Sequence, residues 1–192
     1  MKKRIIAIFV AAVIFCFALT ACSGDKATDS NAPSDNSSSE AGVFGEFTSF
    51  DMKGKAIDNT ALQGKKLTMV NAWATFCGPC ISEMPALQKI SKEYAKKGFQ
   101  IVGLIVDVNV DENGAPYNKS LYAEAEKVIK DTGVKYTNIL LSDSLRQTEA
   151  GSIYSIPTTY FLDENGNQIG KTYVGSRSYE DWCSIIDGLL NE

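Results

Sequence analysis

Cys77 and Cys80 stand three positions apart in the stretch Ala-Thr-Phe-Cys-Gly-Pro-Cys, residues 74–80. Two thiols at this spacing can form part of a zinc site, a structural disulfide or a reversible redox pair. Zinc needs four ligands, and the chain has no histidine and no second Cys-x-x-Cys pair. A disulfide that closes so short a loop constrains little of the unfolded chain. The residues therefore favour the redox pair.

The surrounding sequence predicts different roles for the two thiols. The apolar run 67–73 is typical of a buried strand, which delivers Cys77 to the start of a helix. There, free backbone N–H groups and the helix dipole stabilise a thiolate and lower the thiol pKa below its free value of ~8.5. We therefore expect Cys77 to be the nucleophile. Cys80, one helical turn further on, is expected to attack the mixed disulfide at Cys77 and release the substrate.

Turn residues predict two hairpins around this segment. Lys53-Gly54-Lys55 lies between apolar positions and indicates an opening hairpin within residues 44–64. Asn165-Gly166 is a strong signal for a hairpin between 158–162 and 168–174.

Apolar periodicity predicts the remaining elements. We expect strands at 67–73, 99–108 and 136–141, and helices at 80–97, 120–132 and from Ser178 onward. This order describes an α/β sandwich on a mixed sheet.

The residues around the cysteines resemble the thioredoxin superfamily, and specifically the membrane-anchored TlpA/ResA-type thiol-disulfide oxidoreductases. The resemblance covers roughly residues 44–192 and rests on three features: Trp73-Ala-Thr-Phe-Cys-Gly-Pro-Cys80, Pro85, and Ile156-Pro157-Thr158-Thr159, which looks like the cis-proline loop of that fold. It implies a thioredoxin-like α/β sandwich, with a central mixed β-sheet flanked by helices and an N-terminal β-hairpin.

The resemblance also implies a role for a carboxylate. Glu83 matches the acidic residue that this branch carries just after the cysteines, and by resemblance it handles the proton of Cys80. Asn71 stands six residues before Cys77, where thioredoxin has a buried aspartate. The alternative is that Glu83 is only a favourable acid near a helix start.

A substrate-binding surface follows from the same resemblance. A cis Pro157 would leave the backbone of Ile156 free to pair with a substrate strand. Trp73 and Phe76 are expected to form an apolar rim, although both side chains could belong to the core. The expected substrate-binding residues are Trp73, Phe76, Gly78, Pro79, Ile156 and Pro157.

The N-terminus has the order of a secretory signal. Met1-Lys-Lys-Arg4 is followed by an apolar run, 5–19, which closes on Leu19-Thr-Ala-Cys22. This ending resembles a bacterial lipobox and implies cleavage before Cys22, whose thiol then carries a diacylglyceryl anchor. The alternative, an uncleaved membrane-spanning helix, needs about 20 apolar residues.

This interpretation divides the chain into three parts. Residues 1–21 are a lipoprotein signal peptide, and 22–41 are the lipidated cysteine with a polar linker that cannot bury enough apolar surface to fold. Residues 42–192 are the thioredoxin-like domain, held outside the cytoplasmic membrane.

Composition excludes several classes of function. The chain of 192 residues has a formal net charge of −4, and an acidic body disfavours nucleic acid as a partner. The absence of histidine excludes His-based triads, His metal ligands and imidazole proton shuttles. We expect no metal and no cofactor beyond the Cys77–Cys80 disulfide. Cys183, in an apolar stretch of the last helix, is expected to be a buried, inert thiol.

The sequence thus predicts an extracytoplasmic, lipid-anchored and monomeric enzyme that reduces disulfides in exported proteins. By resemblance, its electrons come from a membrane donor of the DsbD/CcdA type, and candidate clients are apocytochrome c and methionine sulfoxide reductase. A disulfide-forming oxidase is the first alternative. Gly78-Pro79 matches reducing thioredoxins, with a potential of about −270 mV, rather than DsbA at about −120 mV. A non-catalytic binding module is the second, and the intact cysteine pair argues against it.

Overall fold

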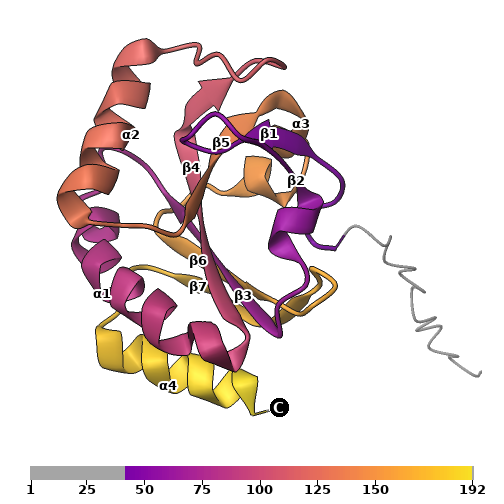
Figure 1. Ribbon diagram of the computed structural model, residues 1–192, viewed down its shortest axis with the longest axis vertical. Helices are drawn as coiled ribbons and strands as arrows, with labels where there is room; N and C mark the ends of the chain where they lie inside the picture. Colours follow the sequence, from indigo (N-terminus) through magenta and orange to yellow (C-terminus); the bar gives the residue numbers. More distant parts are fainter. Residues whose placement is uncertain (1–41, 192) are drawn as a thin grey trace, which may run out of the picture. The chain divides into compact units, whose positions relative to one another are not determined.

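The structure is a computed structural model that describes residues 42–191. The expected signal peptide, Cys22 and the linker up to residue 41 lie outside the described residues. A five-stranded sheet forms the centre, in the order β5-β4-β3-β6-β7 (Figure 1). β3 pairs in parallel with β4, and β4 with β5, while β6 and β7 add antiparallel strands. The strands are β3 (Leu67–Trp73), β4 (Phe99–Val110), β5 (Thr137–Ser142), β6 (Thr158–Leu162) and β7 (Gln168–Val174).

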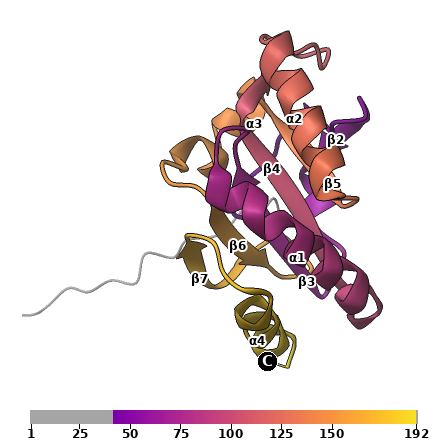
Figure 2. The same ribbon diagram turned by 90° about the vertical axis from the view of Figure 1, so that its left-hand side faces the viewer.

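Helices cover one face of this sheet. α1 contacts both α2 and α4, and Figure 2 shows it lying across the strands. Alternate residues of β3 point toward this layer, where Met69 and Trp73 join the two core clusters that the helices complete. The helices of this layer are α1 (Gly78–Tyr94), α2 (Lys119–Thr132) and α4 (Tyr179–Leu190).

The opposite face is covered by the N-terminal hairpin and short helical turns. Val70 and Ala72 of β3 point to this side and pack in a third core cluster with Phe44, Phe47 and Leu145. The elements here are β1 (Thr48–Phe50), β2 (Ala56–Asp58), α3 (Asp143–Arg146) and the 3₁₀ turns η1 (Asn59–Leu62) and η3 (Glu149–Ser152). The expected α/β sandwich with a mixed sheet and an N-terminal hairpin is confirmed.

The elements begin and end close to the predicted positions. The hairpin strands 158–162 and 168–174 have the expected bounds, and Ser178 caps α4 by accepting the N–H of Asp181. The long helix begins two residues earlier than expected, at Gly78, and a 3₁₀ turn, η2 (Ala95–Lys97), extends it to Gly98, whose positive φ ends it. Sequence reasoning did not predict α3, η1 or η3, because elements of four residues have no detectable periodicity.

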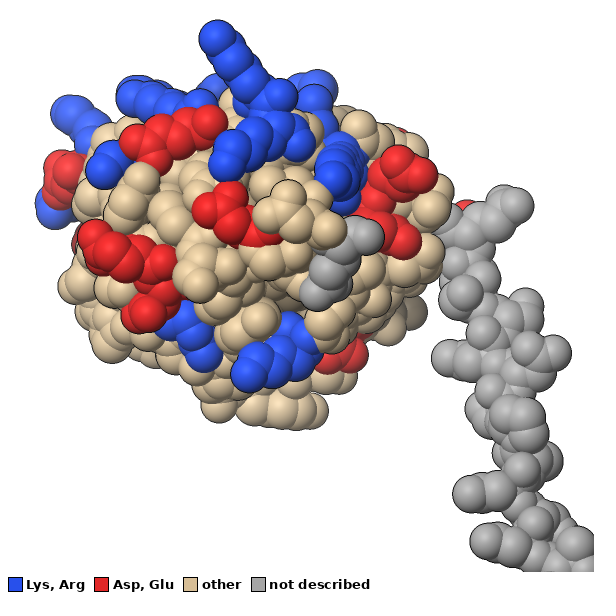
Figure 3. All heavy atoms as spheres, turned by 90° about the horizontal axis from the view of Figure 1, so that it is seen from below, with Lys and Arg blue, Asp and Glu red and all other residues tan. Residues whose placement is uncertain are grey.

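The face of the domain next to α4 carries both signs of charge. Viewed from that side, Lys and Arg gather along one margin, with Asp and Glu among and beside them (Figure 3).

Within residues 42–191, no helix has the length and apolar character needed to cross a membrane.

Candidate active site

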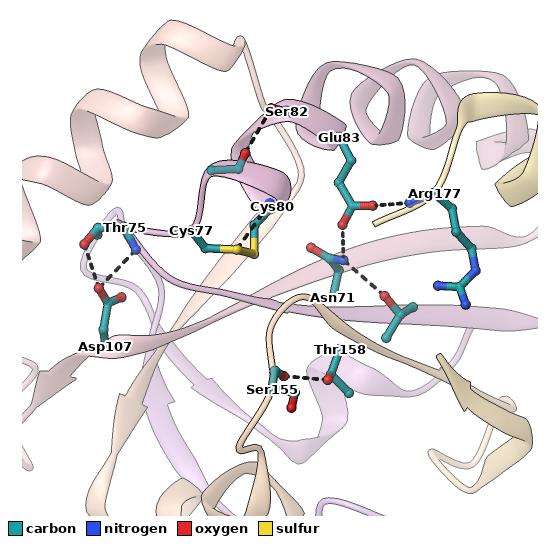
Figure 4. Close-up of a disulfide and its surroundings, with 12 residues drawn as sticks. Asn71, Thr75, Cys77, Cys80, Ser82, Glu83, Asp107, Ser155, Thr158 and Arg177 are labelled. Atoms are coloured by element: carbon teal, nitrogen blue, oxygen red, sulfur yellow. Dashed lines mark hydrogen bonds between the residues drawn. A yellow bond between two sulfur atoms is a disulfide. The ribbon is translucent and has the colours of Figure 1, made fainter. Parts of the chain in front are cut away.

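Cys77 and Cys80 form a disulfide at the N-terminus of α1, with their Cα atoms 5.3 Å apart (Figure 4). Cys77 is the N-cap residue: its backbone is extended, and its Sγ accepts the N–H of Cys80 at 3.2 Å. Pro79 lies in the first turn, where a helix has no need of its missing N–H. As predicted, Cys77 therefore lies between the end of β3 and the start of α1.

Exposure differs between the two thiols and their neighbours. Cys77 is 6% exposed and Cys80 is fully buried, so an incoming sulfur atom meets Cys77 first. Gly78 and Pro79 are exposed, and the ring of Phe76 is 77% exposed. These three residues surround the reachable thiol with open, largely apolar surface.

A carboxylate from β4 fixes the loop that leads into the cysteines. Asp107 Oδ2 accepts two hydrogen bonds from Thr75, one from the backbone N–H at 3.0 Å and one from Oγ1 at 2.6 Å (Figure 4). Asp107 lies where the register of β4 against β5 shifts, between Ile105 and Asn109. Sequence reasoning missed this contact. The contact could have been predicted, because neighbouring parallel strands end at the same edge of a sheet. This brings Asp107 of β4 beside the end of β3.

The loop before β6 adopts the expected cis-proline geometry. The Ile156–Pro157 peptide bond is cis, and the Pro157 carbonyl accepts the N–H of Gly175 at 2.8 Å. Ile156 packs against the core cluster that contains both cysteines. Among residues 42–191, neither backbone group of Ile156 has a hydrogen-bond partner. This loop therefore presents free backbone groups beside the disulfide.

Glu83 is buried and held by three donors. Asn71 Nδ2 of β3 donates to Oε1 at 3.0 Å, while Trp182 Nε1 of α4 and the Arg177 N–H each donate to Oε2 at 3.2 Å. Asn71 Nδ2 also reaches Thr159 Oγ1 on β6, at 3.1 Å. Burial raises the pKa of Glu83, and the hydrogen bonds and the charge of Arg177 oppose this rise. A buried carboxyl group with a raised pKa thus lies one turn beyond Cys80.

The expectation that Trp73 forms part of a substrate rim is wrong. Its side chain is fully buried, and its Nε1 donates to Asn138 Oδ1 at 2.9 Å. The cause is strand parity, because Trp73 lies on the same face of β3 as Met69 and Asn71, beneath the helices. Of the two expected rim residues, only Phe76 is at the surface.

Three further residues were not singled out from the sequence. Arg177 and Trp182 contact Glu83, and Tyr154, two positions before Ile156, is 92% exposed. A buried indole needs a partner for its N–H, and this was the available signal for Trp182. Cys183 is free and half-buried on α4, rather than fully buried as expected. Within residues 42–191, no group of three or more potential ligands is arranged to hold a metal ion.

Comparison with known proteins gives one consistent answer. The sequence model of the Redoxin family matches residues 23–184. Thiol-disulfide oxidoreductase ResA of Halalkalibacterium halodurans is 29% identical over 161 residues, which cover 82% of this chain and 83% of that protein. Thioredoxin-like protein YneN of Bacillus subtilis is 34% identical over 143 residues, which cover 72% of this chain and 75% of YneN.

A solved structure agrees with these sequences. The crystal structure of a thiol:disulfide interchange protein of the thioredoxin family from Chlorobium tepidum superposes with a TM-score of 0.60 at 28% identity, and the match covers 76% of this chain and 93% of that one. The chain belongs to the Redoxin family, within the thioredoxin superfamily, and is a ResA-like thiol-disulfide oxidoreductase.

Proposed function

We propose that this protein reduces disulfides in exported proteins by cycling Cys77 and Cys80 between the dithiol and the disulfide. The observation that carries the proposal is the arrangement of the pair: Cys77 caps α1 at the edge of the surface, and Cys80 lies fully buried one turn inside. This is the geometry that separates an attacking thiol from a resolving thiol.

The exchange proceeds in two steps that balance. The Cys77 thiolate attacks one sulfur of a client disulfide, forms a mixed disulfide and displaces the other client sulfur, which takes up a proton. Cys80 then loses its proton and attacks Cys77 Sγ, which closes the Cys77–Cys80 disulfide and frees the second client thiol. Glu83 is proposed to accept the proton of Cys80. Two electrons reach the client, and the chemistry needs no further cofactor.

The client is proposed to dock as an extended segment along the cis-proline loop. The backbone groups of Ile156, which have no partner within the described part of the chain, suit the addition of a client strand. Phe76, Gly78 and Pro79 offer the surface around Cys77, and Tyr154 adds an exposed aromatic ring on the loop itself. Exposed aromatic side chains favour clients with apolar residues beside the cysteine.

The resemblance extends the proposal to location and partners. A diacylglyceryl group on Cys22 would anchor the protein to the outer side of the cytoplasmic membrane, with residues 23–41 as a tether. A DsbD/CcdA-type membrane protein would restore the dithiol after each turnover. Apocytochrome c and exported methionine sulfoxide reductase are the candidate clients, and the protein would act as a monomer.

A trapping experiment tests the division of labour between the thiols. In membranes, Cys80→Ser should accumulate mixed disulfides with clients and with the electron donor, because the attacking thiol has lost the group that resolves them. Cys77→Ser is the matched control and should capture no partners. Equal capture by both variants, or capture by neither, would contradict the assigned roles. Cys183→Ser in the Cys80→Ser background shows whether the third thiol forms any adduct.

A further inference from the structure

The Glu83 carboxylate depends on a loop that belongs to neither the cysteine motif nor the cis-proline loop. Residues 175–178 connect β7 to α4, and within this loop the Arg177 N–H donates to Glu83 Oε2. In Figure 4 the Glu83 carboxylate lies between the disulfide and this loop. The loop therefore closes one side of the site in which Glu83 is buried.

The Arg177 side chain holds the loop in place through contacts with β7 and α4. Its Nη1 donates to the Gly175 carbonyl at 2.7 Å and also approaches the Val174 carbonyl at 3.5 Å. Its guanidinium carbon lies 4.8 Å from the Tyr173 ring centre and 5.1 Å from the Trp182 ring centre. Cation–π attraction at these distances holds the guanidinium against both rings. The side chain thus joins the end of β7, its own turn and α4.

Both donors to Glu83 Oε2 depend on this arrangement. One donor is the backbone N–H of Arg177 itself, and the other is the indole of Trp182, over which the guanidinium lies. Among residues 42–191, Arg177 also brings the positive charge that acts on Glu83, the smallest of the contributions that lower its pKa. Hydrogen bonds and positive charge both favour the ionised form of a carboxyl group.

The other groups that act on Glu83 do not supply a charge of this sign. Tyr136, before β5, is buried and its interaction with Glu83 disfavours ionisation of its phenol. Asn71 on β3 and Trp182 on α4 are neutral donors. At the start of α1, Cys77 and Cys80 are joined in a disulfide and carry no charge. Arg177 therefore adds a backbone donor and a positive charge to the hydrogen bonds of Asn71 and Trp182, which contribute more to opposing the effect of burial.

We propose that Arg177 is a positioning residue for the exchange reaction: it holds the loop 175–178 against Glu83 and favours the ionised carboxylate, which can accept the proton of Cys80. The inference rests on the proposed function for its consequence in catalysis. Its structural part, the control of Glu83 by Arg177, stands on the contacts alone.

Direct titration of Glu83 tests the structural part without any activity. In the full chain, oxidised and labelled with ¹³C at glutamate carboxyl groups, Arg177→Met should raise the pKa of Glu83 further, because the variant removes the positive charge and the side-chain contacts that hold the loop. Methionine keeps an apolar stem over the rings and removes the charge. Arg177→Lys restores the charge without the planar fork, and should return part of the shift. Arg146→Met, on α3 across the sheet, should leave Glu83 unchanged.

The resolving step gives the second measurement. Since the base must be ionised, a higher pKa of Glu83 moves the pH profile of mixed-disulfide resolution toward higher pH, by the same amount as the titration. An unchanged Glu83 titration in both Arg177 variants would overturn the inference. A shifted titration with an unmoved pH profile would overturn its catalytic part. If the native chain exchanges no disulfides at all, the proposed function fails, and the titration still decides the role of Arg177.

Discussion

Glu83 differs from an ordinary helix carboxylate because of its surroundings. Its side chain is 5% exposed, and its two oxygens accept three N–H groups from three separate parts of the chain. Burial raises the pKa of Glu83 above the usual 4.5. A carboxyl group with a raised pKa is better matched to a thiol than an exposed one, because proton transfer is most efficient when the pKa of the base lies near the working pH.

Glu83→Gln should therefore slow the resolving step by about 10²-fold, the usual contribution of a general base, while the first attack by Cys77 changes much less. Rapid mixing of the reduced protein with a disulfide-containing peptide separates the two steps. Native-like resolution at every pH from about 6 to 9 would mean that Glu83 takes no part in the proton transfer.

For single residues, sequence reasoning found those whose roles depend on their neighbours in the chain. The positions of Cys77 and Cys80 follow from a strand end and a helix start, and the cis bond at Pro157 follows from the resemblance of its motif. Arg177 and Asp107 were missed because each acts on a residue distant in the chain, Glu83 and Thr75 respectively. Such contacts depend on which strands become neighbours, and one sequence does not give that order.

Among the elements, β3 does most to position the active site. All seven of its residues are buried, and it pairs with β4 on one side and β6 on the other. Its end therefore meets both the Asp107 region of β4 and the cis-proline loop before β6. The sequence predicted a strand buried on both faces, but an apolar run alone does not show which strands flank it.

Gly103 on β4 shows how closely β3 is packed against its neighbours. A Cβ atom at this position would lie 2.0 Å from Asn138 Oδ1 and 3.2 Å from Trp73 Nε1. Gly103→Ala should thus disrupt the Trp73–Asn138 hydrogen bond and lower the free energy of unfolding by about 1–3 kcal/mol, the usual cost of overpacking. Urea denaturation measures the change.

Gly188→Ala on α4 is the matched control. A Cβ atom there meets nothing within 4 Å, and alanine is favoured over glycine in a helix by up to about 1 kcal/mol. This variant should be at least as stable as the native chain. If Gly103→Ala were equally stable, the packing of β4 against Trp73 would be looser than the structure indicates.

For the molecule as a whole, the fold gathers the redox pair and the surface around it at the start of α1. The two cysteines lie there beside Ile156, whose backbone has no hydrogen-bond partner among residues 42–191, and next to the exposed Phe76. The helical layer buries Glu83. The general architecture was predictable because the hydrophobic periods of the longer strands and helices agreed with their elements. The direction of electron flow was not, since oxidants and reductants share this fold and differ in the stability of the disulfide.

The midpoint potential of the Cys77–Cys80 couple tests the proposed reductase activity most directly. The full chain is equilibrated in thiol buffers of graded potential, and the fraction of oxidised pair is read by mass from the peptide that contains both cysteines. We predict a value close to that of reducing thioredoxins, about −270 mV. A midpoint above about −150 mV, close to that of the oxidant DsbA, would contradict the account and identify the protein as a disulfide-forming oxidase.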